Sequence, residues 1–142
     1  MTVKAETRQG LRALDVGLVY LHGSRTGTRA RADSDVDLAV VFTRRPDPGR
    51  IARIHPRLYN LFAAEFPERK TGDVDIAYLQ DAALAFQFRV IAEGRLLFES
   101  DPGVRADYEE SVIKQYLDFR PIEAQFSAAL MERLDGSRSG TS

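Results

Sequence analysis

The chain of 142 residues contains no cysteine and no tryptophan. Without thiols it can form neither a disulfide nor a thiolate metal site, which excludes disulfide-stapled folds and zinc–cysteine modules. Its two histidines, His22 and His55, lack the spacing of a metal-ligand pair, and we interpret both as structural. No apolar run approaches the roughly 18 residues of a membrane span, and the opening MTVKAETRQG lacks the apolar stretch of a signal peptide. We therefore expect a cytoplasmic protein with no membrane segment.

An excess of charge of either sign is also missing. The 20 Lys and Arg residues against 21 Asp and Glu give a formal net charge of −1, and the pI is about 6.1. Domains that grip nucleic acid along its phosphates usually carry a clear basic excess, so we expect no direct nucleic-acid grip, although a local basic patch stays compatible with these numbers. The sequence also contains no G-x-x-x-x-G-K-[ST] loop and no G-x-S-x-G elbow, which argues against a P-loop enzyme and a serine hydrolase of that type.

What remains is the composition of an ordinary globular domain, with 44% hydrophobic and 29% charged residues. The length suffices for one domain with a real core. We predict a single domain over residues 1–134 and a disordered tail over 135–142, where DGSRSGTS has no apolar residue.

Hydrophobic periodicity predicts alternating helices and strands. Helices are expected over 4–15, over 51–66 and from 84 to a C-cap at 94, and strands over 17–23, 36–42, 72–79 and 94–100, with a turn over 44–49. From 104 to 134 an apolar stripe predicts more helix, kinked or split at Pro121, and this stripe fits either a core face or an interface. The order predicts an α/β fold, a small mixed sheet flanked by helices, with strand 36–42 covered on both faces.

Two aspartates, Asp35 and Asp37, stand at the head of the second predicted strand in SDVDLAVV. Side chains at i and i+2 of a strand point to the same face, so the two carboxylates repel each other unless something compensates. So placed, they can reach one divalent cation or share a pair of ions, and their hard oxygen atoms suit Mg²⁺ or Mn²⁺. We interpret the pair as a cation site, although a D-x-D taken alone is equally typical of a loop edge.

The preceding stretch, HGSRTGTRARA, is typical of a loop that holds phosphates. Gly23 lets the backbone approach a ligand closely, and the hydroxyl of Ser24 adds a donor. Arg25, Arg29 and Arg31 would add positive charge for a polyphosphate, although arginines in loops are more often simply solvated. A phosphate-binding loop that is followed by a cation-binding pair predicts a site for a metal–nucleotide complex.

A second carboxylate pair, Asp73 and Asp75, lies in the predicted strand GDVDIAYL. Asp75 stands between Val74 and Ile76, and a charged residue inside an apolar strand calls for a specific role. We predict that Asp75 is a third carboxylate, which holds a metal ion and helps to deprotonate an attacking hydroxyl. Asp73, at the mouth of the strand, is interpreted as a solvated strand end.

These residues resemble a known superfamily. G-S, a spacer, S-D-V-D-L and a later strand aspartate are similar to the DNA polymerase β-type nucleotidyltransferases, and most of all to their minimal single-domain members, the MNT proteins. The segments VDIAYL, EGRLLFES and YEESVIKQYLDFRPIEAQF resemble later parts of MNT antitoxins that are paired with HEPN toxins. The chain departs from the family where a glycine is common five residues after the first, because it has Thr28 there and places Gly27 one residue earlier.

The resemblance implies the site residues. Gly23 and Ser24, together with Arg25, would bind the nucleotide phosphates, and Asp35, Asp37 and Asp75 would be the catalytic, metal-binding carboxylates, with two Mg²⁺ ions expected.

The resemblance also implies the function. It is that of a nucleotidyltransferase that moves AMP from ATP to a tyrosine hydroxyl of a HEPN ribonuclease toxin and so acts as its antitoxin. Two alternatives stay open: transfer to a small hydroxylated molecule such as an antibiotic, and an antitoxin that neutralises its partner by binding alone.

Overall fold

The computed structural model describes residues 3–23, 36–66 and 74–119. These form α1 (Ala5–Ala13), β1 (Val16–His22), β2 (Val36–Phe42), α2 (Pro48–Glu65), β3 (Val74–Tyr78), the 3₁₀ turn η2 (Leu79–Asp81), α3 (Leu84–Glu93) and β4 (Arg95–Glu99). Residues 104–119 are also helical. The strands make one sheet in the order β3-β2-β1-β4, in which β2 and β3 are parallel and the other pairs antiparallel. The predicted α/β fold with a small mixed sheet is confirmed.

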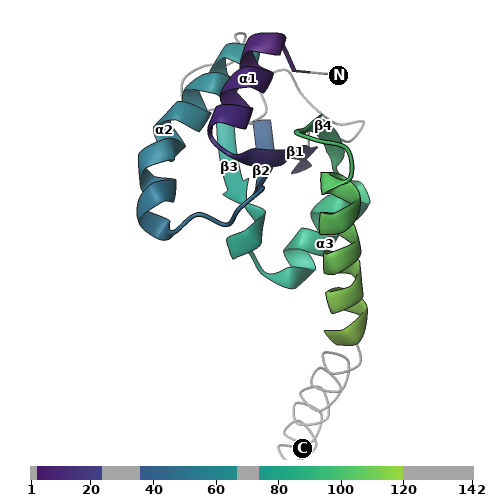
Figure 1. Cartoon of the computed structure of the whole chain (residues 1–142). Helices are drawn as coiled ribbons and strands as arrows, with labels where there is room; N and C mark the ends of the chain where they lie inside the picture. Colours follow the sequence, from purple (N-terminus) through teal and green to yellow (C-terminus); the bar gives the residue numbers. More distant parts are fainter. Residues whose placement is uncertain (1–2, 24–35, 67–73, 120–142) are drawn as a thin grey trace, which may run out of the picture.

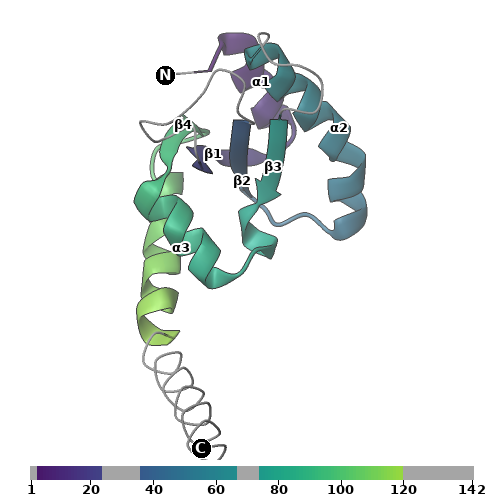
Figure 2. The ribbon, with the colours of Figure 1, turned by 180° about the vertical axis from the view of Figure 1, so that it is seen from behind.

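The sheet separates two layers of helices (Figures 1 and 2), with α1 and α2 on one face and α3 with helix 104–119 on the other. Side chains of β2 alternate between the layers: Leu38 and Val40 join the core under α1 and α2, whereas Ala39 and Val41 join the core under α3. Strand β2 is therefore buried on both faces, as its sequence predicts.

Helix α2 begins earlier than its periodicity predicts. Asp47 is the N-cap, with a side-chain oxygen that accepts a hydrogen bond from the backbone N–H of Arg50 at 2.8 Å, and Pro48 occupies the first helical position. Both residues are favoured there, because aspartate satisfies a free N–H and proline has none to lose. The predicted turn over 44–49 is consequently wrong at its last two residues, and the helix starts at residue 48 rather than 51.

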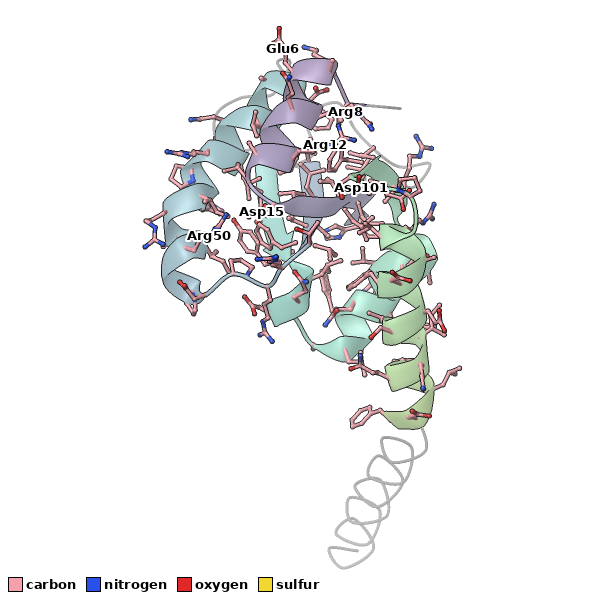
Figure 3. All side chains as sticks on the ribbon, viewed as in Figure 1. Glu6, Arg8, Arg12, Asp15, Arg50 and Asp101 are labelled. Carbon is pink, nitrogen blue, oxygen red and sulfur yellow. The ribbon has the colours of Figure 1, made fainter. Side chains whose placement is uncertain are left out.

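The start of β1 is tied to its surroundings by two arginines (Figure 3). Asp15, which has a φ of +62°, accepts a hydrogen bond from Arg50 of α2 at 2.7 Å. Arg12, at the end of α1, donates to the backbone oxygen of Ser100 at 2.8 Å, and its guanidinium lies 5.7 Å from the ring centroid of Phe98. These contacts fix α1 between α2 and the end of β4.

Helix 104–119 packs on the α3 side and extends beyond the sheet, away from α1 and α2 (Figure 1). Of the predicted apolar stripe, Val112 is buried, Tyr116 stacks on Phe88 with ring centroids 4.1 Å apart, and Phe119 is 47% exposed. Pro121, the rest of the stripe and the predicted tail over 135–142 lie outside the described residues. In the part of the chain that is described, no helix is both long and apolar enough to cross a membrane.

Candidate active site

Three polar side chains meet where β1 ends and where β2 and β3 begin. Asp37 of β2 lies directly opposite Asp75 of β3 on one side and opposite His22 of β1 on the other. Residues that face each other across paired strands project to the same side of a sheet. Because His22 and Asp37 alternate with residues of the α1–α2 core, all three side chains lie on the side that α3 covers in part.

The two aspartates form the chemical centre of this cluster. Neighbouring strands are about 4.8 Å apart, so the two carboxylates can approach one another closely. Asp75 is exposed and Asp37 is half-buried. Like charges opposite each other destabilise a sheet unless a cation compensates, and a set of carboxylate oxygens fits Mg²⁺. Asp35, the other predicted carboxylate, and Asp73 lie outside the described residues, which by themselves contain no group of three or more potential ligands able to hold a metal ion.

Gly23 follows β1 and contacts the cluster through its backbone. Its φ is +78°, and a Cβ atom built on it would collide with the carboxyl group of Asp37. Only glycine therefore combines this backbone angle with so close an approach to the carboxylate. Ser24 and Arg25, predicted with Gly23 to bind the phosphates, lie outside the described residues, as do Arg29 and Arg31.

His22 has a position that the sequence alone did not indicate. Its ring meets Phe86 of α3 edge-on, with centroids 5.5 Å apart and an interplanar angle of 78°. Burial lowers its pKa from the usual 6.5, while the charges of Asp37 and Asp75 act in the opposite direction. Strand alternation could have indicated this position. His22 comes two residues after Tyr20 and therefore lies on the same face of the sheet, the face under α3. His55 instead bonds the hydroxyl of Tyr78, on the opposite side of the sheet.

A pocket of about 220 Å³ adjoins this cluster, between the end of β1 and α3. Its lining consists of His22, Gly23, Phe86, Arg89, Val90 and Glu93. Within it, Nε of Arg89 lies 3.3 Å from a carboxylate oxygen of Glu93, and both side chains are largely exposed. The contribution of α3 was not predicted, since its helical periodicity does not tell which strand it packs against.

A family model described as polymerase beta, nucleotidyltransferase matches residues 8–103, a range that contains all four strands and the cluster at their ends. The chain belongs to this nucleotidyltransferase family. The match runs from within α1 to just beyond β4, so the site described above lies inside the family domain.

Several solved structures share the fold of this nucleotidyltransferase. A toxin–antitoxin structure with AMP-PNP is 22% identical, covers 90% of this chain and 99% of its own, and has a TM-score of 0.62. A mutant of the MntA–HpeT toxin–antitoxin complex is 18% identical over 89% and 96% of the two chains, also with a TM-score of 0.62. A structure of a tri-AMPylated Shewanella oneidensis HEPN toxin in complex with MNT antitoxin is 17% identical over 89% and 97%, with a TM-score of 0.59. No curated protein matches the chain at a significant level.

Proposed function

We propose that this nucleotidyltransferase moves AMP from ATP to a tyrosine hydroxyl of a partner HEPN ribonuclease toxin, and thereby acts as the toxin's antitoxin. The observation that carries the proposal is the in-register placement of Asp37 and Asp75 on parallel neighbouring strands, facing the same side. The similar solved structures support the nucleotide and the partner, because one contains AMP-PNP and another contains an AMPylated HEPN toxin with an MNT antitoxin.

We assign the metal site to the carboxylates of Asp35, Asp37 and Asp75, whose hard oxygen atoms fit Mg²⁺. Bound Mg²⁺, two ions in this proposal, would neutralise charge on the α-phosphate and make the acceptor hydroxyl more acidic. Gly23, Ser24 and Arg25 would bind the phosphates, with the backbone at Gly23 held close to Asp37. Positioning and charge neutralisation supply most of the catalysis in phosphoryl-type transfer.

The proposed reaction is one in-line displacement. The acceptor oxygen attacks the α-phosphorus of ATP, and a new oxygen–phosphorus bond forms as its proton passes to Asp75 or to solvent. The bond between the α-phosphorus and the oxygen that bridges to the β-phosphate breaks, and pyrophosphate leaves with the electron pair. AMP remains esterified to the acceptor.

Among the described residues, the site extends to the edge of the sheet. In the part of the chain that the structure describes, strand β3 is at the edge of the sheet, and Asp75 is exposed. The exposure of Asp75 fits an acceptor hydroxyl that is carried by another protein. This supports a protein acceptor over the alternative of a small hydroxylated molecule, for which an enclosing pocket is usual.

Neutralisation by binding alone is the second candidate. It is favoured by three large apolar side chains that helix 104–119 exposes: Ile113 at 37%, Leu117 at 52% and Phe119 at 47%. Ile113 and Leu117, one helical turn apart, lie on one face of the helix, whereas Phe119 lies on another, and an exposed apolar pair of this kind fits a protein interface. This mode requires no nucleotide, and it can operate together with AMP transfer.

The experiment that tests the proposal uses purified protein, Mg²⁺, α-³²P-labelled ATP and a lysate of the organism that encodes the chain. The unmodified protein should label one small protein, and Asp37→Asn or Asp75→Asn should reduce labelling by at least about 100-fold. Asp107→Asn, an identical change on an exposed residue of helix 104–119, is the matched control and should label normally. Label confined to small molecules, or unchanged labelling by both site variants, would contradict the proposal.

A further inference from the structure

The pocket beside Gly23 contains a cationic side chain that the proposed reaction has not used. Arg89 of α3 lines this pocket, and its side chain is 76% exposed. The ion pair with Glu93, one turn later in the same helix, is exposed at both ends, and such pairs contribute little to stability. The guanidinium of Arg89 can therefore exchange Glu93 for a more highly charged anion at little cost.

Arg89 lies on the opposite side of the cluster from the edge strand. In the strand order, β3 with Asp75 is at one side, β2 with Asp37 follows, and β1 with His22 comes next. Arg89 adds positive charge beyond His22, near enough that its charge acts to lower the pKa of that histidine. The site thus runs from negative carboxylates at β3 and β2 to a positive guanidinium at the pocket.

This gradient of charge matches the two ends of a nucleoside triphosphate chain. The α-phosphate belongs over the carboxylates, where the metal ions and the acceptor meet. The β- and γ-phosphates would then extend away from the carboxylates, toward the pocket between the end of β1 and α3. This pocket contains both the backbone at Gly23 and the guanidinium of Arg89.

We propose that Arg89 is a phosphate-binding residue of the nucleotide site, one that holds the two phosphates which leave as pyrophosphate. The inference rests on the proposed nucleotidyl transfer and adds a residue from α3 to it. When the bond from the α-phosphorus to the bridging oxygen breaks, that oxygen keeps the electron pair and the departing pyrophosphate gains negative charge. Charge-assisted hydrogen bonds from the planar fork of arginine become stronger as this charge develops.

The remaining pocket residues support this role. Phe86, packed edge-on against His22, and the buried Val90 form an apolar wall beside the guanidinium. Because the Arg89 side chain is 76% exposed, this wall shields a bound phosphate from water on one side only. Glu93, the ion-pair partner of Arg89, lines the same pocket.

The test measures binding, by calorimetry in the presence of Mg²⁺, of three probes: ATP, AMP and inorganic tripolyphosphate. Arg89→Gln should weaken ATP and tripolyphosphate by about 10- to 100-fold and leave AMP unchanged, because only AMP lacks the departing phosphates. Arg89→Lys should recover part of the affinity, since a lysine keeps the charge but not the fork. Arg95→Gln is the matched control, because Arg95 faces Leu21 on the α1–α2 side of the sheet. This variant should bind all three probes with normal affinity.

A second variant separates phosphate binding from a merely structural ion pair. Glu93→Gln removes the partner of Arg89 and should leave tripolyphosphate affinity equal or higher, whereas a structural pair would make both variants behave alike. If Arg89→Gln lost affinity for AMP and ATP equally, the pocket would hold the nucleoside, which would overturn the inference. It would also be overturned if Arg89→Gln bound ATP and tripolyphosphate with unchanged affinity, or if the unmodified protein bound neither. Because no probe requires an acceptor, the result does not depend on whether a HEPN toxin is modified.

Discussion

Gly23 is the residue at which backbone geometry and chemistry are most tightly coupled. Its positive φ brings the chain so close to Asp37 that a single methyl group would strike the carboxylate. The start of the predicted phosphate loop and the carboxylate that we propose as a metal ligand therefore cannot be adjusted independently.

Gly23→Ala should consequently impair the site more than the fold. A left-handed backbone costs alanine about 1–2 kcal/mol, and displacement of Asp37 should slow AMP transfer by about 100-fold. Gly103→Ala is the control, because Gly103 has a φ of +95° but no atom within 4 Å of the added Cβ. Thermal unfolding should show a similar loss of stability in both variants, while labelling should fall only in Gly23→Ala. Full activity of Gly23→Ala would show that the close approach to Asp37 has no functional role.

Helix 104–119 depends on a small set of polar contacts with the elements beneath it. The hydroxyl of the buried Tyr20 in β1 donates to Glu109 at 2.9 Å, and Arg105 donates to the same carboxylate oxygen at 2.7 Å. The hydroxyl of Tyr108 donates to Gln87 of α3 at 2.7 Å. The sheet, α3 and the helix are thus joined around one carboxylate and one amide.

Removal of the Tyr20 hydroxyl should weaken this junction. Tyr20→Phe deletes the donor and should lower the free energy of unfolding by about 1–3 kcal/mol, because the lost bond ends on a charged group. Urea unfolding measures the loss. Glu109→Gln should destabilise the protein as well. In a double-mutant cycle, the double variant should lose less free energy of unfolding than the sum of the losses in the two single variants. Strict additivity would mean that the hydrogen bond contributes nothing to stability.

The elements were more readily predicted than their contacts. The bounds of strand 36–42 are identical in prediction and structure, because its unbroken apolar run carries the signal. Asp37 was indicated by its pairing with Asp35 at the head of an apolar strand, and Asp75 by its place inside another apolar strand. Their direct pairing, however, arises from the parallel register of β2 and β3. Arg89 lies in the pocket beside them only because α3 packs on β1. Such long-range packing leaves no local pattern in a sequence.

The whole molecule contains three tyrosines whose pKa values are raised above the usual 10, in each case chiefly by burial: Tyr20, Tyr78 and Tyr108. For Tyr78 burial raises the pKa to about 12. The folded state therefore favours the neutral phenols. Their contribution to stability is fully present below pH 10, the unfolded value, and is lost as the pH rises toward and through the folded values.

We accordingly expect an alkaline limit to stability. The free energy of unfolding should decline between pH 10 and about pH 12, and the buried phenols should ionise together with the loss of structure. Urea unfolding at several pH values, followed in parallel with tyrosinate absorbance, measures both effects. Tyr78→Phe should make the decline less steep. Ionisation of all five tyrosines at pH 10 with the fold intact would contradict the expectation.

The order of the strands also has a consequence for how the protein is made. During synthesis β1 and β2 emerge before β3 and can form an antiparallel hairpin, in which strand β2 contains Asp37. Strand β3 joins β2 in parallel, which requires the crossover through α2 to be complete before Asp75 can take its place. A nascent chain that has not yet released α2 and β3 from the ribosome therefore lacks the carboxylate of Asp75 beside Asp37. The protein should therefore gain metal binding and transfer activity late and in a single step, when β3 pairs with β2.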